Sequence, residues 1–128
     1  MKAYITCPIS HTKERLSLLP EIKKIVESKG IVPAVFEVRE DAKEIFQADY
    51  SDIKSSELII AEVSEPSHGV GIEIGMSYCL GLKRILLLEK GKHVTPMASG
   101  MPGTTIIEYE NLEDMKSKLS SALDNFKE

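Results

Sequence analysis

Short apolar runs alternate along the chain with segments whose apolar residues recur at helical spacing. The apolar runs predict five strands, at residues 2–7, 31–36, 58–63, 84–88 and 104–109. This alternation is typical of βαβ units, in which helices connect parallel strands. The pattern therefore predicts an α/β fold with a single doubly wound five-stranded parallel sheet, flavodoxin-like or Rossmann-like, with helices on both faces.

The segments between the strands predict four helices. In the first, apolar residues recur from Leu18 to Val26, Gly30 follows as a stop signal, and Pro20 either kinks the helix or marks its start. The second lies within residues 40–56, the third runs from about 69 to 82, and Asn111 can cap the fourth. Residues 89–103 are rich in Gly and Pro and are expected to form a long loop, which in compact domains is often functional.

Length and charge narrow the range of functions. The 128 residues fit one domain, and 16 basic against 20 acidic residues give a net charge of −4. That balance argues against a surface for a nucleic-acid polymer. No apolar stretch approaches the length of a membrane span, and the N-terminal apolar run is too short for a signal peptide.

The cysteines and histidines fit no metal-binding or redox spacing. Cys7 and Cys79 are far apart, and the three histidines are scattered. We therefore expect reduced thiols in a cytoplasmic protein, with no metal and no other cofactor.

Ligands of doubly wound sheets bind outside the carboxyl ends of the strands. Three segments are expected to converge there, at residues 7–13, 36–39 and 64–73. In the third, the strand runs into Pro66-Ser67, and Gly69, Gly71 and Gly75 follow at the start of a helix. Glycines allow a ligand close to the backbone, and the free N–H groups of a helix start bind anions. A dinucleotide fingerprint is disfavoured, because the third glycine falls one residue late and the unit follows the third strand.

Two carboxylates are candidates for chemistry at this edge. Glu73 near the helix start could simply interact with the helix dipole, which is typically worth under about 1 kcal/mol. Asp49 precedes the third strand, however, so both groups can face one pocket, and paired carboxylates divide nucleophile from acid in glycoside-cleaving sites. Glu62 and Glu65 are rivals. We expect the first to be structural within its strand and the second to be solvated.

The chain resembles the nucleoside 2-deoxyribosyltransferase superfamily over nearly its whole length. The resemblance rests on Tyr4 in the first strand, Pro8-Ile9 after it, Asp49, and the run Glu-Val-Ser-Glu-Pro-Ser-His-Gly-Val-Gly-Ile-Glu-Ile-Gly at residues 62–75. Within this superfamily, the chain most resembles the branch of the 2'-deoxynucleoside 5'-phosphate N-hydrolases. The resemblance implies that Glu73 is a nucleophile forming a glycosyl-enzyme, that Asp49 assists departure of the base, and that Tyr4 orients the nucleophile.

The resemblance also implies a set of binding residues. A loop that holds the sugar phosphate or 5' end comprises Cys7, Pro8, Ile9, Ser10, His11, Thr12 and Lys13. Ser67 and Gly69 match a second part of the phosphate cradle. The protein is expected to be a homodimer in which each subunit completes the neighbouring site with Thr95, Pro96, Met97 and, less closely matched, Ser99.

The chain departs from the branch in two places. Ser10 stands where an arginine is usual, and His11 and Lys13 can compensate only in part. The segment between Glu37 and Asp49 is shorter than in the animal enzymes, so the wall that contacts the base differs. Phe36 either stacks on the base or packs in the core at its strand end.

Three functions remain open from the sequence. The leading one is hydrolysis of a (deoxy)nucleoside 5'-monophosphate to free base and sugar phosphate. The second is transfer, in which another base rather than water captures the glycosyl-enzyme. The third is a non-catalytic nucleotide-binding domain, since a fold does not determine a function. The presence of both Glu73 and Asp49 argues against the third.

Overall fold

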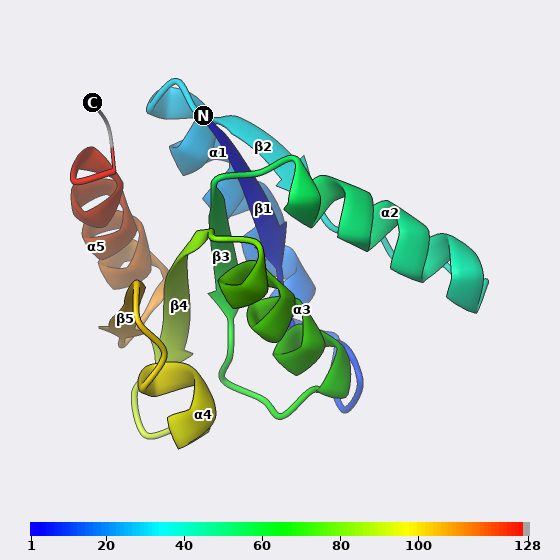
Figure 1. Ribbon diagram of the computed structural model, residues 1–128. Coiled ribbons are helices and arrows are strands. Elements are labelled where there is room, and N and C mark those ends of the chain that lie inside the picture. Colours follow the sequence, from blue (N-terminus) through cyan, green and yellow to red (C-terminus); the bar gives the residue numbers. More distant parts are fainter. Residues whose placement is uncertain (127–128) are drawn as a thin grey trace.

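The computed structural model describes residues 1–126. These residues contain one five-stranded sheet with all strands parallel, in the order β2-β1-β3-β4-β5 (Figure 1). The strands are β1 (Lys2–Thr6), β2 (Val32–Val35), β3 (Leu58–Glu62), β4 (Lys83–Glu89) and β5 (Thr104–Tyr109). The helices are η1 (Glu14–Ser17, a 3₁₀ turn), α1 (Leu18–Ser28), α2 (Ala42–Lys54), α3 (His68–Cys79), α4 (Pro96–Ser99) and α5 (Leu112–Asp124). The predicted fold class, five strands and four main helices are confirmed.

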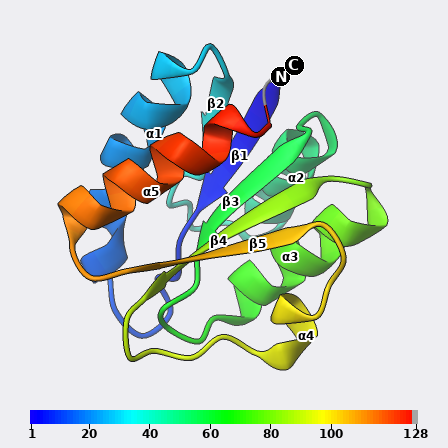
Figure 2. The same ribbon diagram turned by 90° about the vertical axis from the view of Figure 1, so that its left-hand side faces the viewer.

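Helices cover both faces of the sheet (Figure 2). α1 and α5 pack on one face, and α2 and α3 pack on the other. Every residue of the central strand β3 is buried, as expected for a parallel strand covered on both sides. Ile53 alone of the α2 residues is fully buried, so the rest of this helix is open to solvent or to the pocket described below.

Side-chain caps mark the starts of α2 and α5. Asp41 caps α2 by accepting a hydrogen bond from the Glu44 N–H at 3.0 Å, and Asn111 caps α5 in the same way. Pro20 is the third residue of α1, in the first turn, where backbone N–H groups need no partner within the helix. The helix therefore begins before Pro20.

The predicted long loop at residues 89–103 is partly wrong. β4 extends to Glu89, and Pro96–Ser99 form the short helix α4. The Thr95 hydroxyl oxygen accepts a hydrogen bond from the Met97 N–H at 3.3 Å, and Pro96 follows it at the first helical position. A capping side chain before a proline at the first position is a helix-start signal, even where the helix has only one turn.

A buried arginine ties η1 to the carboxyl ends of three strands. Arg15 donates to Glu65 at 3.1 Å, to the Tyr109 hydroxyl at 3.3 Å and to Glu89. Its guanidinium also lies 4.0 Å from the fully buried Glu62 carboxylate. Because η1 directly follows the loop after β1, this cluster holds one end of that loop against the sheet.

The Arg15 cluster yields a stability prediction. Arg15→Met should lower the free energy of unfolding by about 3 kcal/mol, because it leaves the Glu62 carboxylate buried without a cation. Lys24→Met is the control, since Lys24 forms only an exposed ion pair with Glu21 and should change stability by less than about 1 kcal/mol. Urea denaturation at pH 7 measures both, and equal losses would contradict a special role for Arg15.

Candidate active site

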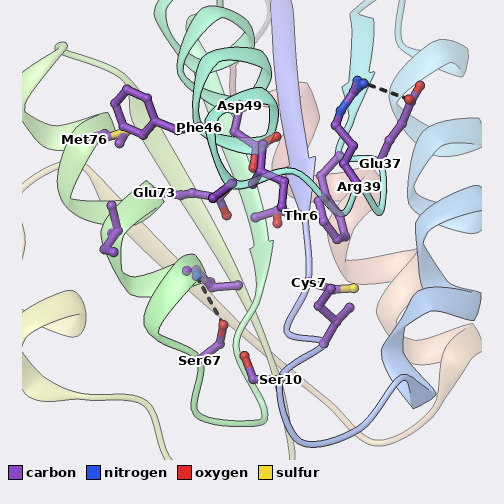
Figure 3. Close-up of a pocket in the computed structure, with 17 residues that line it drawn as sticks. Thr6, Cys7, Ser10, Glu37, Arg39, Phe46, Asp49, Ser67, Glu73 and Met76 are labelled. Carbon is purple, nitrogen blue, oxygen red and sulfur yellow. Dashed lines mark hydrogen bonds and ion pairs between the residues drawn. The ribbon is translucent and has the colours of Figure 1, made fainter.

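One pocket of about 330 Å³ opens at the carboxyl ends of β1, β2 and β3. Its walls come from the loops that follow these strands and from α2 and α3 (Figure 3). The lining residues are Thr6, Cys7, Ile9, Ser10, Phe36, Glu37, Arg39, Ala42, Ile45, Phe46, Asp49, Ser67, Gly69, Val70, Ile72, Glu73 and Met76. The three segments expected to converge do so.

The structure brings together only some of the residues expected in the site. Those that line the pocket are Glu73, Asp49, Cys7, Ile9, Ser10, Phe36, Ser67 and Gly69. Tyr4 lies buried beneath it. Those outside its lining are Pro8, His11, Thr12, Lys13, Thr95, Pro96, Met97 and Ser99. Thr95 instead lines a second pocket of about 350 Å³, which shares Ser67 and Val70 with the first.

Glu73 is 7% exposed and points from the second turn of α3 into the pocket. No acidic residue occupies the first turn of this helix. The interaction of a helix dipole with a charge falls off within that turn, so it does not account for a buried glutamate at this position. The Tyr4 hydroxyl donates a 2.5 Å hydrogen bond to Glu73 Oε2.

The surroundings of Glu73 favour its neutral form. The pKa of the Glu73 carboxyl is raised to about 7, mainly by burial and also by the nearby Asp49 carboxylate, against the lowering effect of the hydrogen bond from Tyr4. Burial also raises the pKa of Asp49, against the lowering effects of Glu73, Tyr4 and the Arg39 guanidinium. Two interacting carboxyl groups with raised pKa values in one pocket are typical of acid–base and nucleophilic sites.

The two rival glutamates are structural. Glu62 is fully buried and accepts hydrogen bonds from the Ser64 N–H at 2.7 Å, the Ser64 hydroxyl at 2.6 Å and the Tyr109 hydroxyl. Its predicted structural role is confirmed. The expectation that Glu65 is solvated is wrong, because this side chain is half-buried between Arg15 and Lys92, which both form ion pairs with it.

Cys7 lines the pocket as a neutral thiol. Its pKa is raised to about 12, mainly by burial and also by the Glu62 and Glu73 carboxylates. Cys7 and Cys79 are both free. Within residues 1–126, no group of three or more His, Cys, Asp and Glu side chains is placed to hold a metal ion.

The core-packing role considered for Phe36 is confirmed, and stacking on the base stays a prediction. It lines the pocket and packs against the buried cores on the two faces of the sheet. Its place at the end of β2 explains this, because a side chain there sits between the core and the open edge.

Several lining residues were missed by sequence reasoning. They are Thr6, Glu37, Arg39, Ala42, Ile45, Phe46, Val70, Ile72 and Met76. Helical periodicity counted from the two carboxylates was the available signal. Ala42, Ile45 and Phe46 precede Asp49 by seven, four and three residues, and Val70 and Met76 lie three before and three after Glu73. Glu37 and Arg39 fall in the 36–39 segment, which was expected at this edge without roles for those two side chains.

The sequence model described as "Nucleoside 2-deoxyribosyltransferase" matches residues 3–119. The chain belongs to this family. It is therefore an enzyme of the N-glycosidase or deoxyribosyltransferase type, and it acts on small nucleosides or nucleotides.

Two similar sequences carry names from the same family. A protein of Thermofilum pendens whose name places it with the 2'-deoxynucleoside 5'-phosphate N-hydrolases is 26% identical over 136 residues, covering 96% of this chain and 95% of its own. One of Syntrophotalea carbinolica with the same name is 32% identical over 81 residues, covering 62% and 57%.

Two solved structures show the same fold. The CMP N-glycosidase of Clostridium botulinum superposes with a TM-score of 0.71 at 24% identity, covering 93% of this chain and 98% of its own. The 2-deoxyribosyltransferase of Bacillus psychrosaccharolyticus gives a TM-score of 0.70 at 18% identity, covering 93% and 96%. In the described part of this chain, no helix is long and apolar enough to cross a membrane.

The raised pKa of Glu73 predicts a pH-dependent loss of stability. With a pKa of about 7 when folded against 4.5 for the ordinary group, the folded state binds more protons than the unfolded state between these pH values. Stability contributed by this site therefore falls as pH rises through that window. Glu73→Gln should match the wild type near pH 4.5 and exceed its free energy of unfolding by about 1–3 kcal/mol at pH 8.

Urea denaturation of both proteins across pH 4.5–8 measures this difference. Glu40→Gln, an exposed change outside the pocket, is the control and should show no such growing difference. A constant difference between Glu73→Gln and wild type over the whole range would contradict the buried, proton-holding state of Glu73.

Proposed function

We propose that the protein hydrolyses the N-glycosidic bond of (deoxy)nucleoside 5'-monophosphates, releasing free base and (deoxy)ribose 5-phosphate through a glycosyl-Glu73 intermediate. One observation carries the proposal. Glu73 and Asp49 line one pocket, and a buried tyrosine donates a hydrogen bond to Glu73 from beneath. The name shared by the two similar sequences supports the same reaction.

The hydrogen bond from Tyr4 leaves one carboxylate oxygen of Glu73 to react. Tyr4 engages Oε2, so Oε1 attacks C1' of the sugar. The bond from C1' to the base nitrogen breaks, and its electron pair goes to the base, which takes a proton from Asp49. Water then attacks C1' and displaces the Glu73 carboxylate, while Asp49 accepts the proton from that water.

The end of the pocket nearest Ser10 and Ser67 suits the phosphate (Figure 3). Ser67 accepts a hydrogen bond from the Val70 N–H at 3.3 Å, so its hydroxyl proton is free to donate to an anion. Gly69 lines the same end at the start of α3, where backbone N–H groups lack partners within the helix. These neutral hydroxyl and N–H donors take the place of the arginine that is usual at position 10.

Base exchange uses the same nucleophile and is the second candidate, because the matching family is described by that activity. It differs only in the group that attacks the intermediate. Free Cys7 and Cys79 fit a reducing compartment, so we place the reaction in the cytoplasm.

Substrate choice tests the proposal. The kcat/KM for base release from a deoxynucleoside monophosphate should exceed that from the matching nucleoside by at least ~10-fold, because only the monophosphate occupies the cradle. Ser67→Gly should narrow this ratio while preserving the helix start, since glycine is a tolerated cap. Added acceptor base should not speed base release.

Glu73→Ala should abolish base release, and Glu40→Ala should leave it unchanged as the matched control. Equal efficiency on nucleoside and monophosphate, with exchange into an added base, would replace hydrolysis by transfer. Wild-type rates in Glu73→Ala would reject both mechanisms.

The apolar outer face of α3 supports a homodimer. The inward positions Val70, Glu73, Ile74 and Ser77 are buried, yet Ile72 on the outside is 59% exposed. A helix that is apolar all round is usually covered on all sides.

The segment expected to complete a neighbouring site is placed to reach outward. Met97 is 81% exposed at the start of α4, and neither it nor Pro96 lines the pocket of its own subunit. Phe46, which does line that pocket, is also exposed. We propose that Thr95, Pro96 and Met97 of each subunit cover the pocket of the other.

Mixed dimers test this arrangement. Glu73→Ala and Met97→Glu homodimers should each be inactive, whereas re-associated mixtures should recover roughly a quarter of wild-type activity, since half of the dimers then hold one complete site. Sedimentation velocity checks that each variant alone is dimeric. A wild-type protein that is monomeric and active, or mixtures of dimeric variants that stay inactive, would contradict the proposal.

A further inference from the structure

The loop between β2 and α2 places an ion pair on the pocket wall. Arg39 Nη2 lies 3.2 Å from Glu37 Oε2, and both residues line the pocket. The reaction proposed above gives neither side chain a contact with the substrate. Within residues 1–126, Glu37 is the only ion-pair partner of Arg39.

This pair is a poor candidate for a structural contact. The Glu37 side chain is 71% exposed and that of Arg39 is 37% exposed. Ion pairs so exposed contribute about 0–1 kcal/mol to stability. Charged groups on an apolar pocket wall instead serve to orient a ligand.

The pair lies at the end of the pocket where the base must leave. Figure 3 shows Ser10 and Ser67 at one end, Thr6, Asp49 and Glu73 between, and Glu37 and Arg39 on the far side. The Arg39 guanidinium is close enough to Asp49 to lower the pKa of that carboxyl. The acid that protonates a departing base must contact it, so groups around Asp49 surround the base.

An apolar wall for the face of the base lies across Asp49 from the ion pair, where Figure 3 shows Phe46 beside Met76. Phe46 and Ile72 line it from α2 and α3, and the Phe46 ring is stacked on Tyr50 with centroids 5.7 Å apart and planes 6° apart. An aromatic and aliphatic wall contacts a ring face, and the charged groups are left to meet its edge.

Building on the proposed hydrolase, we propose that Glu37 and Arg39 select the base by its edge, and that they favour cytosine, adenine or guanine over thymine and uracil. A carboxylate only accepts hydrogen bonds and a guanidinium only donates them. Glu37 therefore accepts from an exocyclic amino group, and Arg39 donates to the ring nitrogen or carbonyl oxygen beside it.

Thymine and uracil fit this pair badly. Their single free N–H lies between two carbonyl oxygens, which repel a carboxylate approaching it. The favoured bases each carry an amino group with an adjacent acceptor. Discrimination of this kind arises from the polar group that the wrong ligand leaves unpaired.

The competing role for Arg39 is a grip on the phosphate, in place of the arginine missing at position 10. Its place beside Asp49, with the catalytic carboxylates between it and Ser67, argues against this (Figure 3). The two roles predict different effects of Arg39→Gln. If Arg39 contacts the base, the substitution lowers the preference among bases. If it grips the phosphate, the substitution lowers the preference for monophosphate over nucleoside.

Rates on matched substrates test the inference. For the wild type, kcat/KM for dCMP should exceed that for dUMP by at least ~10-fold. Glu37→Gln should reduce this ratio to below ~3-fold, because an amide both donates and accepts. Glu40→Gln, in the same loop but outside the pocket, should preserve it.

Arg39→Gln should also reduce the dCMP-to-dUMP ratio while changing the monophosphate-to-nucleoside ratio by less than ~3-fold. If it instead removes the preference for monophosphate and leaves the base ratio intact, Arg39 grips the phosphate and the inference is overturned. Equal ratios in wild type and Glu37→Gln would overturn it as well.

Calorimetry separates this inference from the proposed function. Titration of the Glu73→Ala protein with dCMP and dUMP measures base preference without turnover, and Glu73→Ala combined with Glu37→Gln is its comparison. A binding preference lost in the double variant supports base selection even if the wild type releases no base, which would reject only the hydrolase. Equal binding of the two nucleotides to Glu73→Ala overturns the inference.

Discussion

The site depends on one hydrogen bond, from the Tyr4 hydroxyl to Glu73 Oε2 at 2.5 Å. A carboxylate removed from water is costly unless donors replace the lost hydration. Tyr4 supplies such a donor from β1, the strand beside the one that leads into α3. The bond thus joins two segments 69 residues apart and stabilises the charged form of Glu73, the form its proposed role as nucleophile requires.

Glu62 and Glu73 lie in one short segment, but their surroundings give them different roles. Glu62 accepts hydrogen bonds from Ser64 and Tyr109, has Arg15 nearby, and is fully buried. These partners compensate the charge of Glu62, so its role is to hold the ends of the neighbouring strands together. Glu73 has Tyr4 beneath it and a second carboxyl, Asp49, beside it. Burial and the Asp49 carboxylate raise the pKa of Glu73 despite the hydrogen bond from Tyr4, a perturbation typical of functional carboxyl groups.

Periodicity and glycine placement predicted the fold, because each strand and helix is specified by local pattern and the parallel order follows from their alternation. They also located Glu73 and Asp49, which flank the same sheet edge. The partners of Glu65 were not predictable, since Arg15 reaches it from η1, 50 residues earlier in the chain. The short helix α4 was missed because Gly and Pro dominate its surroundings, although Thr95 before Pro96 is a start signal.

The same helix turns chemistry inward and an apolar surface outward. Glu73 faces the pocket from α3, while its neighbour Ile72 is exposed on the outer side and still contributes to the pocket wall. Val70 and Ile74 hold the inner side against the sheet, but the outer side has no such support within residues 1–126. A subunit packed on that side would restrain the helix that carries Glu73, the proposed nucleophile. Dimer formation would then also help to position Glu73, because its hydrogen bond with Tyr4 tolerates little movement of α3.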